Sequence, residues 1–267
     1  SAIFPSVRAI GEGKGETLFY LTAKTITGTV AQEAFHILRE KGLKFKVTAI
    51  TAKEKLCFQD TPECTPEKCP YAKGHFDRVN DAVYELWTTE EVYSREVIRA
   101  HAEKWQVCPF EMCLDLSIWV DGIICDYNYV FDPNVHLKRF FGENISGDYI
   151  FLIDEAHNLV ERGREMYSAG ISRQSLVALR KKIRKRFSKL ARTLDKANRQ
   201  MMELEENLAE TGKGYQVLPN PGVLPITFLT ISGELEEILE EKELEEELRR
   251  EILEFYFIVR DFLNVSE

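Results

Sequence analysis

The residues best suited to chemistry are Asp154, Glu155 and His157, in the run Asp-Glu-Ala-His that follows apolar residues 149–153. A buried strand ending in two adjacent carboxylates is typical of nucleotide-binding α/β proteins. One carboxylate ligates hydrated Mg²⁺, and the next polarises the attacking water. An ordinary buried strand followed by an acidic helix start would give the same pair, because acids favour helix N-termini. The full four-residue pattern favours the magnesium site.

A phosphate-binding loop of the form G-x-x-x-x-G-K-[ST] does not occur in the sequence. The nearest stretch, residues 11–17, has Gly15 after Gly13 and Lys14, and it precedes an expected strand instead of following one. We interpret it as a flexible loop. The first catalytic motif of an ATPase is therefore missing from these residues.

Four of the six cysteines lie in one segment, with intervals of seven, five and thirty-nine residues: Cys57, Cys64, Cys69 and Cys108. Four thiolates suit a soft metal centre, either zinc or an iron–sulfur cluster, and the spacing does not choose between them. Cys113 lies about one helical turn beyond Cys108 and could compete as a ligand. Cys125 falls within an apolar strand, which is typical of a buried, unreactive thiol.

The hydrophobic pattern of the first half predicts strands that alternate with helices. Strand–helix–strand in so few residues is a βαβ unit, so the strands should be parallel, as in a RecA-like nucleotide-binding lobe. Thr29 and Gln32 are spaced as a capping box, and Gly42 stands in a terminating position. The expected elements are helices at 2–10 and 29–41 and strands at 16–22, 45–52, 118–129 and 149–154.

After residue 172 the apolar residues recur at spacings of three and four, which predicts two long antiparallel helices over about 174–210 and 234–263. Residues 173–199 carry eleven basic side chains and one acid, Asp195, whereas residues 234–247 are nearly all Glu and Leu. The basic face either contacts DNA or is a solvated face paired with the acidic second helix. The pattern leaves these two interpretations open.

Composition limits the class of protein. A chain of 267 residues with 44% apolar content has room for about two domains. No apolar run would span a bilayer and no signal-peptide pattern opens the chain, so we expect a cytoplasmic protein with no membrane contact. A net charge of −9 argues against a uniformly basic coat for nucleic acid. In that compartment six cysteines are expected to serve metal or redox chemistry.

Several motifs, in one order, resemble the XPD/DinG-type DNA helicases, superfamily 2 enzymes with an iron–sulfur domain, and bacterial members most of all. The resemblance covers residues 1 to about 171, while the helical remainder matches in position and character only. The motifs are Thr-Ala-Lys-Glu-Lys-Leu-Cys at 51–57, Cys-Pro-Tyr at 69–71, Cys-Pro-Phe-Glu at 108–111, Cys-Asp-Tyr-Asn-Tyr-Val-Phe-Asp-Pro at 125–133 and Asp-Glu-Ala-His at 154–157.

This resemblance implies ATP-driven 5′→3′ translocation on single-stranded or forked DNA, with a 4Fe–4S cluster on Cys57, Cys64, Cys69 and Cys108. Nothing in the sequence fixes the oligomeric state, and we expect a monomer. The same resemblance implies that Asp154 holds Mg²⁺, that Glu155 activates water, and that His157 couples the nucleotide state to DNA binding. Thr22, Lys24 and Thr25 would contact the DNA backbone, a role that suits short polar groups after a strand.

The resemblance also implies a domain organisation. Residues 1–56 and 111–171 would form an incomplete first RecA-like lobe, residues 57–110 a helical iron–sulfur insertion, and residues 172–267 a largely helical Arch-like domain. The phosphate loop would precede Ser1 and the second lobe would follow Glu267. We therefore expect a helicase fragment that does not hydrolyse ATP by itself, because catalysis draws charge stabilisation from both lobes.

Two other classes of function stay open at this stage. A non-catalytic four-cysteine metal-binding module that holds nucleic acid or protein would explain the absent phosphate loop without truncation. A helical interaction protein that dimerises through its long hairpin is the second, and neither the Asp-Glu-Ala-His run nor the cysteines recommend it.

Overall fold

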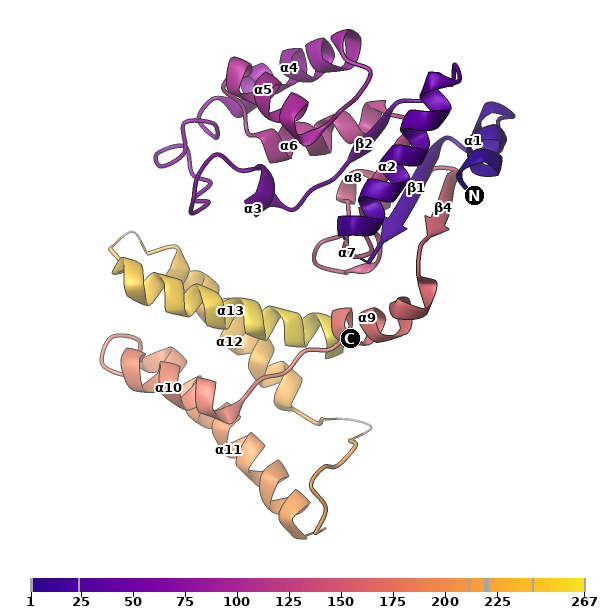
Figure 1. Ribbon diagram of the computed structural model, residues 1–267. Coiled ribbons are helices and arrows are strands. Elements are labelled where there is room, and N and C mark those ends of the chain that lie inside the picture. The colour runs from indigo at the N-terminus through magenta and orange to yellow at the C-terminus, as the bar shows by residue number, and fades with distance from the viewer. Residues whose placement is uncertain (1, 24, 211, 219–220, 242, 267) are drawn as a thin grey trace. The chain divides into compact units, whose positions relative to one another are not determined.

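The computed structural model describes residues 2–23, 25–210, 212–218, 221–241 and 243–266. The chain divides into two compact units, Ser1–Met166 and Tyr167–Glu267. The first unit holds a β-sheet, whereas the described residues of the second form helices and connections (Figure 1). None of the helices in the described ranges has the length and hydropathy that a membrane crossing requires.

The first unit is a four-stranded sheet with helices packed on it. All of its strands are parallel, in the order β2-β3-β1-β4. The α/β class with a parallel sheet, predicted from the sequence, is confirmed. Its elements are α1 (Ile3–Gly11), β1 (Thr17–Thr22), α2 (Thr25–Glu40), β2 (Val47–Ala49), α3 (Lys53–Leu56), α4 (His75–Thr89), α5 (Arg95–Trp105), α6 (Pro109–Leu116), η1 (Ser117–Trp119), β3 (Gly122–Asp126), α7 (Asn128–Phe131), α8 (Lys138–Phe141), β4 (Tyr149–Ile153), η2 (Ala156–Asn158) and α9 (Leu159–Met166).

The two faces of the sheet bury separate hydrophobic clusters, because successive side chains of a strand point to opposite faces. Leu18 and Ile124 pack with α1 and α2 on one face. Phe19, Leu21 and Ile123 pack on the other face with α4, α5 and α6. Figure 1 shows α2 lying along the sheet and α4 to α6 gathered as a separate helical group. The central strands are thus covered on both sides, as parallel strands usually are.

Three predicted boundaries are wrong. The strand expected at 118–129 is only β3, because η1 precedes it and the Asp126 carboxylate turns the chain by accepting the Asn128 N–H at 2.9 Å. The strand expected at 45–52 is the three-residue β2. Helix α2 begins at Thr25, so the capping box predicted at Thr29 lies inside it. Gly42 does end this helix, with φ of 92°.

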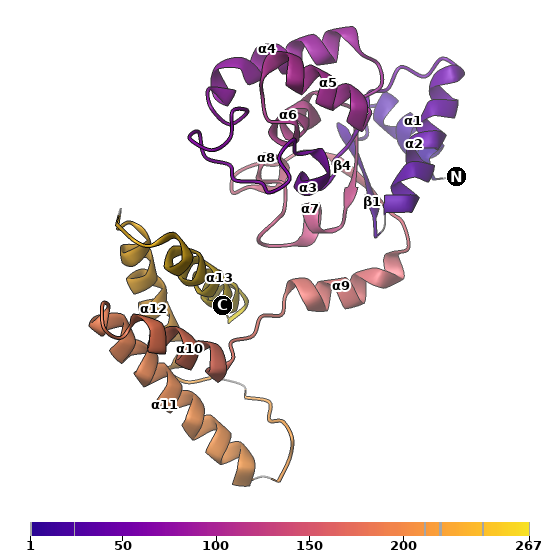
Figure 2. The same cartoon turned by 60° about the vertical axis from the view of Figure 1, so that its left-hand side comes forward.

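The second unit contains four described helices instead of the two predicted long ones. Figure 2 shows α10 (Arg173–Ile183) doubling back on α11 (Ser188–Glu210). The four helices of this unit share one core, which includes the fully buried Leu176, Leu194, Phe228 and Val259. The helices are α10 (Arg173–Ile183), α11 (Ser188–Glu210), α12 (Leu224–Leu239) and α13 (Glu246–Ser266).

The break after Ile183 was hidden by an apolar spacing that continues through it. Phe187 continues the apolar spacing of three and four residues between Ile183 and Leu190. Its N–H, however, donates to the Ile183 carbonyl at 2.8 Å in a turn. Folding back there lets α10 and α11 bury their stripes in one core. Helix α12 starts near Pro225, ten residues before the predicted start, because proline is tolerated in a first turn.

Candidate functional site

The carboxyl ends of the parallel strands meet along one edge of the sheet. Thr22, the last residue of β1, pairs with Asp126 of β3, and Leu21 pairs with Ile153 of β4. The Asp154 amide then donates to the Leu21 carbonyl at 2.9 Å, which extends the pairing by one bond. This edge is where α/β proteins place their ligands. The predicted Asp-Glu-Ala-His run therefore lies at the edge its proposed role requires.

The acidic pair sits on a sharp turn between β4 and η2. Glu155 has φ of 50° and ψ of 44°, the left-handed conformation that costs a residue with a side chain about 1–2 kcal/mol. Asp154 is half-buried and Glu155 is exposed. The Glu155 carboxylate contacts His157 Nδ1 at 3.3 Å. Strain of this kind persists where the surroundings enforce it, commonly at functional sites.

Tyr127 holds that turn and was missed by the sequence reasoning. Its hydroxyl contacts the carbonyl oxygen of Asp154 and lies 3.1 Å from that of Glu155. Burial raises the pKa of Tyr127, and the carboxylates of Asp154 and Glu155 raise it further. The hydroxyl therefore stays protonated as a donor. The Asp-Tyr-Asn run at 126–128 contains this residue, but only the tertiary fold reveals what the phenol touches.

Arg162 ties α9 to the same edge. One of its nitrogens lies 3.2 Å from Asp126 Oδ1 and 3.1 Å from Asn128 Oδ1. The Asp126 carboxylate thus both turns the chain after β3 and accepts a charge-assisted bond. Sequence patterns gave no signal for Arg162, because its partners lie more than thirty residues away.

The predicted DNA-contact residues lie at the end of β1. Thr22 is only 5% exposed and lines a cavity of about 520 Å³ at the carboxyl edge. Thr51, Lys55, Arg95 and Asn128 line the same cavity. Lys24 lies outside the described residues, and Thr25 begins α2 with its side chain likewise outside the description. The short polar and basic groups around Thr22 are of the kind that hold phosphates.

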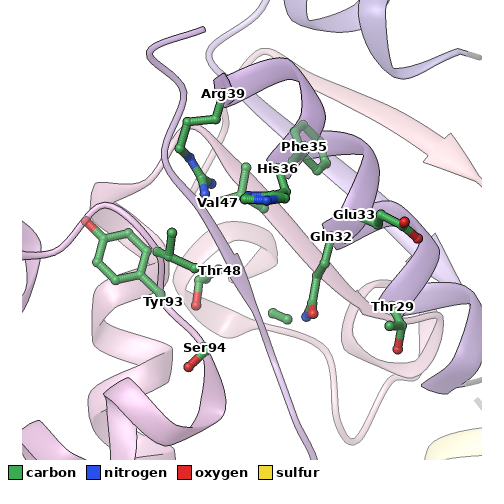
Figure 3. Close-up of a pocket in the computed structure, with 12 residues that line it drawn as sticks. Thr29, Gln32, Glu33, Phe35, His36, Arg39, Val47, Thr48, Tyr93 and Ser94 are labelled. Carbon is green, nitrogen blue, oxygen red and sulfur yellow. The ribbon is translucent and has the colours of Figure 1, made fainter. Parts of the chain in front are cut away.

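A second cavity, of about 370 Å³, lies at the β2 edge of the sheet and contains none of the predicted site residues. Figure 3 shows Gln32, His36 and Arg39 of α2 on one side of it, with Tyr93 and Ser94 opposite. The backbones of Thr48 and Tyr93 form a parallel bridge there. This bridge covers part of the open edge of β2, which limits unwanted strand pairing.

The four predicted ligand cysteines all have described positions, but no three potential ligand residues in the described chain lie close enough together to hold a metal ion. Cys57 follows α3, and its sulfur accepts the Gln59 N–H at 3.4 Å. Cys108 caps α6, and its N–H donates to His75 Nδ1 at 3.2 Å. Cys57 and Cys108 thus lie at the end of α3 and at the start of α6, at the two ends of the insertion.

Two of these thiols face one cation. The pKa of Lys53 is raised mainly by a hydrogen bond to Cys64, with a smaller contribution from Cys108. Burial raises the pKa of Cys108 itself. Cys64 and Cys108, forty-four residues apart in the sequence, are therefore brought to a common neighbourhood by α3 and α6.

Cys113 and Cys125 are buried in the core. Burial raises the pKa of Cys113 to about 11 and that of Cys125 still further. The Cys113 sulfur lies 3.8 Å from both Thr48 Oγ1 and the Ala49 carbonyl oxygen. Because metals bind thiolates, these environments disfavour both residues as ligands.

The basic segment of the second unit divides into paired and unpaired side chains. Five of the eleven basic residues form ion pairs with acids: Arg173, Arg180, Lys182, Arg186 and Lys189. Six are exposed and have no ion-pair partner in the described part of the chain: Lys181, Arg184, Lys185, Arg192, Lys196 and Arg199. Three of these pairs, those of Lys182, Arg186 and Lys189, are with acids after residue 233, as the paired interpretation predicts. DNA contact by the unpaired side chains stays a prediction.

Comparisons with known proteins agree with these features. The sequence is 26% identical over 180 residues to the Fanconi anemia group J protein homolog of Gallus gallus. It is 32% identical over 114 residues to the general transcription and DNA repair factor IIH helicase subunit XPD/RAD3 of Saccharomyces cerevisiae. These matches cover 60% and 43% of this chain but 14% of each relative, so the chain spans a small part of their length.

A solved structure of a truncated XPD has the same fold, with a TM-score of 0.53 and 18% identity, over 98% of this chain and 72% of that one. The DEAD_2 family profile matches residues 38–176, more than half of the chain. The predicted relation to XPD/DinG-type helicases is confirmed, and this chain belongs to the DEAD_2 family.

Proposed function

We propose that this chain is a segment of an ATP-dependent DNA helicase that moves 5′→3′ on single-stranded DNA, including forked substrates, in the cytoplasm. The observation that carries the proposal is the acidic pair on a strained turn at the carboxyl edge, beside the end of β1. The yeast relative is named as a helicase subunit of a general transcription and DNA repair factor, which supports the same assignment.

Each side chain at this edge of the sheet would have a separate role in ATP hydrolysis. Asp154, half-buried at the end of β4, would ligate the Mg²⁺ of bound ATP, which supplies charge neutralisation for phosphoryl transfer. Glu155 is more exposed and would accept the proton of the attacking water. His157, 3.3 Å from the Glu155 carboxylate, would sense that charge and pass the nucleotide state toward the DNA-contacting residues Thr22, Lys24 and Thr25.

We expect the 267-residue chain alone to show no ATPase activity above background, with or without single-stranded DNA. The sequence has no Gly-Lys-Thr or Gly-Lys-Ser loop to hold the β- and γ-phosphates. DNA-stimulated turnover that disappears in a Glu155→Gln variant would contradict this. Reading the coding frame upstream of Ser1 is a further test, since a Gly-Lys-Thr there favours the helicase. Its absence favours the non-catalytic metal-binding module.

The four insertion cysteines are proposed to hold a 4Fe–4S cluster, which would add a covalent tie between α3, the 57–74 loop and α6. Three observations on the residues fit this group: unpaired thiols, an N–H directed at the Cys57 sulfur, and a cation shared by Cys64 and Cys108. Hydrogen bonds and positive charge near the sulfurs are the usual means of tuning such clusters.

Metal content tests the cluster independently of catalysis. Protein prepared without oxygen should be brown and contain about four iron and four sulfide per chain. Serine at Cys57, Cys64, Cys69 or Cys108 should remove the colour. Serine or alanine at Cys113 or Cys125 should leave it intact. Stoichiometric zinc without sulfide, or colour lost at Cys113 but kept at Cys108, would overturn the assignment.

A further inference from the structure

A groove on α4 has no part in the proposed nucleotide, DNA or cysteine chemistry. It has a volume of about 440 Å³ and lies between α4, the end of α6 and η1. Three aromatic side chains, Tyr84, Trp87 and Trp119, and two carboxylates, Asp81 and Asp115, line most of it. Among the residues that the structure describes, no basic side chain lines it.

Large apolar groups are unusually exposed around this groove. Tyr84 is 70% exposed, Trp119 is 63% exposed and Ile118, beside it, is 52% exposed. Phe76, two helical turns before Tyr84 on the same face of α4, is 86% exposed. A contiguous patch of exposed aromatic residues usually marks an interaction site, and Trp and Tyr dominate binding energy at such sites.

Two acids of α4, unlike Glu85 of the same helix, have no ion-pair partner among the described residues. They are Asp77 and Asp81, which are exposed and four residues apart. Like charges at this spacing repel each other along the helix. Arg78 forms no ion pair with either acid, and its guanidinium instead donates to the carbonyls of Lys73, Trp105 and Gln106. Asp115 is already held by Arg139 at 2.6 Å.

The floor of the groove is fixed before any partner arrives. The Trp87 indole N–H donates to the Trp119 carbonyl at 2.8 Å. The Lys46 ammonium lies 4.6 Å from the centre of the Trp87 ring. A surface already held in one conformation loses less entropy when it binds.

We propose that this groove docks a segment of another protein in which an arginine or lysine stands beside a large apolar side chain. The cation would pair with Asp81 and lie over the exposed ring of Tyr84 or Trp119, where cation–π attraction adds to the ion pair. The apolar neighbour would cover the remaining aromatic surface. Nucleic acid does not fit, because its phosphates would meet Asp77 and Asp81. The inference does not depend on the proposed helicase activity.

Fluorine NMR of the full chain carrying 5-fluorotryptophan tests the docking. The chain has three tryptophans, and Trp119→Phe assigns the relevant signal. A seven-residue peptide of leucine and arginine, with both termini chemically blocked, should shift the Trp119 signal with a Kd of about 0.1 mM. Added salt should weaken the binding of this peptide. Trp105, whose indole donates to Glu85 at 2.6 Å, should not shift and serves as an internal control.

Two variants and a second peptide decide the outcome. Asp81→Lys should weaken binding at least fivefold, while Glu143→Lys, a matched reversal at an exposed site off α4, should not. An unchanged Trp105 signal would verify that each variant is folded. An equal shift with glutamate in place of arginine, or no shift at millimolar peptide, would overturn the proposal. A Trp119 shift on protein concentration alone, with a dimer mass by light scattering, would assign the groove to a second copy and also overturn it.

Discussion

At the scale of residues, Glu155 combines chemistry with strain. A left-handed backbone conformation at a glutamate costs conformational free energy, yet this turn places the two carboxylates at the open edge of the sheet. Tyr127, by contacting both carbonyls of the turn, supplies the restraint. Sequence reasoning found the acids because their types and spacing are distinctive. It missed Tyr127 because a phenol that contacts a distant backbone leaves no local pattern.

The strain at Glu155 predicts a gain in stability when it is relieved. Glu155→Gly should raise the free energy of unfolding by up to about 1 kcal/mol, because glycine adopts positive φ without the steric cost. Glu161→Gly, at an exposed site in the first turn of α9, should instead lose up to about 1 kcal/mol. Urea denaturation measures both. Equal losses at the two positions would show that the turn at Glu155 carries no strain.

Tyr93 predicts a loss of stability at alkaline pH. It is 3% exposed, and burial, helped by Asp121 and Glu90, raises its pKa from 10 to about 12. Between those values the tyrosine ionises in the unfolded chain but not in the folded one. The contribution of the protonated Tyr93 hydroxyl to the free energy of unfolding is therefore complete below pH 10 and declines as pH rises toward 12.

Tyr93→Phe removes that titration and serves as the comparison. The stability difference between the parent and Tyr93→Phe should be constant below about pH 9 and shrink above pH 10, as urea midpoints over this range would show. Tyr215→Phe, at a 74% exposed site, is the control and should follow the parent. Parallel curves for the parent and Tyr93→Phe up to pH 11.5 would refute the shift.

At the scale of elements, the basic hairpin predicts where nucleic acid meets the second unit. Arg192, Lys196 and Arg199 are unpaired, exposed and spaced on one face of α11. Reversing all three to Glu should weaken binding of single-stranded DNA several-fold. It should also make the binding less dependent on salt, because each lost phosphate contact reduces the slope of log K against log salt concentration by about 0.7.

A matched triple charge reversal elsewhere on the chain distinguishes loss of local phosphate contacts from an effect of net charge. Lys41, Lys44 and Lys73 are exposed residues of the first unit, and changing them to Glu alters the total charge equally. Fluorescence anisotropy with a labelled oligonucleotide compares the two. Equal weakening would assign the effect to overall charge, and unchanged binding in both would favour a solvated face.

The limits of prediction at this scale have physical causes. The strand before Asp154 and the helix end at Gly42 follow from apolar runs and from glycine at positive φ, both local properties. The turn after Ile183 could not be foreseen, because Phe187 preserves the helical rhythm while tertiary packing bends the chain. Likewise Pro225 suggests a loop by itself but lies in the first turn of α12.

At the scale of the whole molecule, the chain contains separate cores. Phe19 is fully buried between the rings of Phe140, Tyr149 and Phe151, whose centres lie 5.2–5.4 Å away. Phe228 is equally buried in the second unit, with Phe262 at 5.2 Å. The buried clusters around these two rings share no residue. Each unit should therefore respond to damage in its own core.

Reciprocal cavity variants of the full chain test this independence. Phe19→Ala or Phe228→Ala removes a fully buried ring and should cost its own unit about 3–5 kcal/mol. Hydrogen exchange followed by mass spectrometry should then show faster amide exchange in β1, β3 and β4 for Phe19→Ala, with α10 to α13 unchanged. The pattern should invert for Phe228→Ala, since local opening tracks the stability of each cooperative region. Faster exchange across both units in either variant would mean that the two fold as one cooperative body.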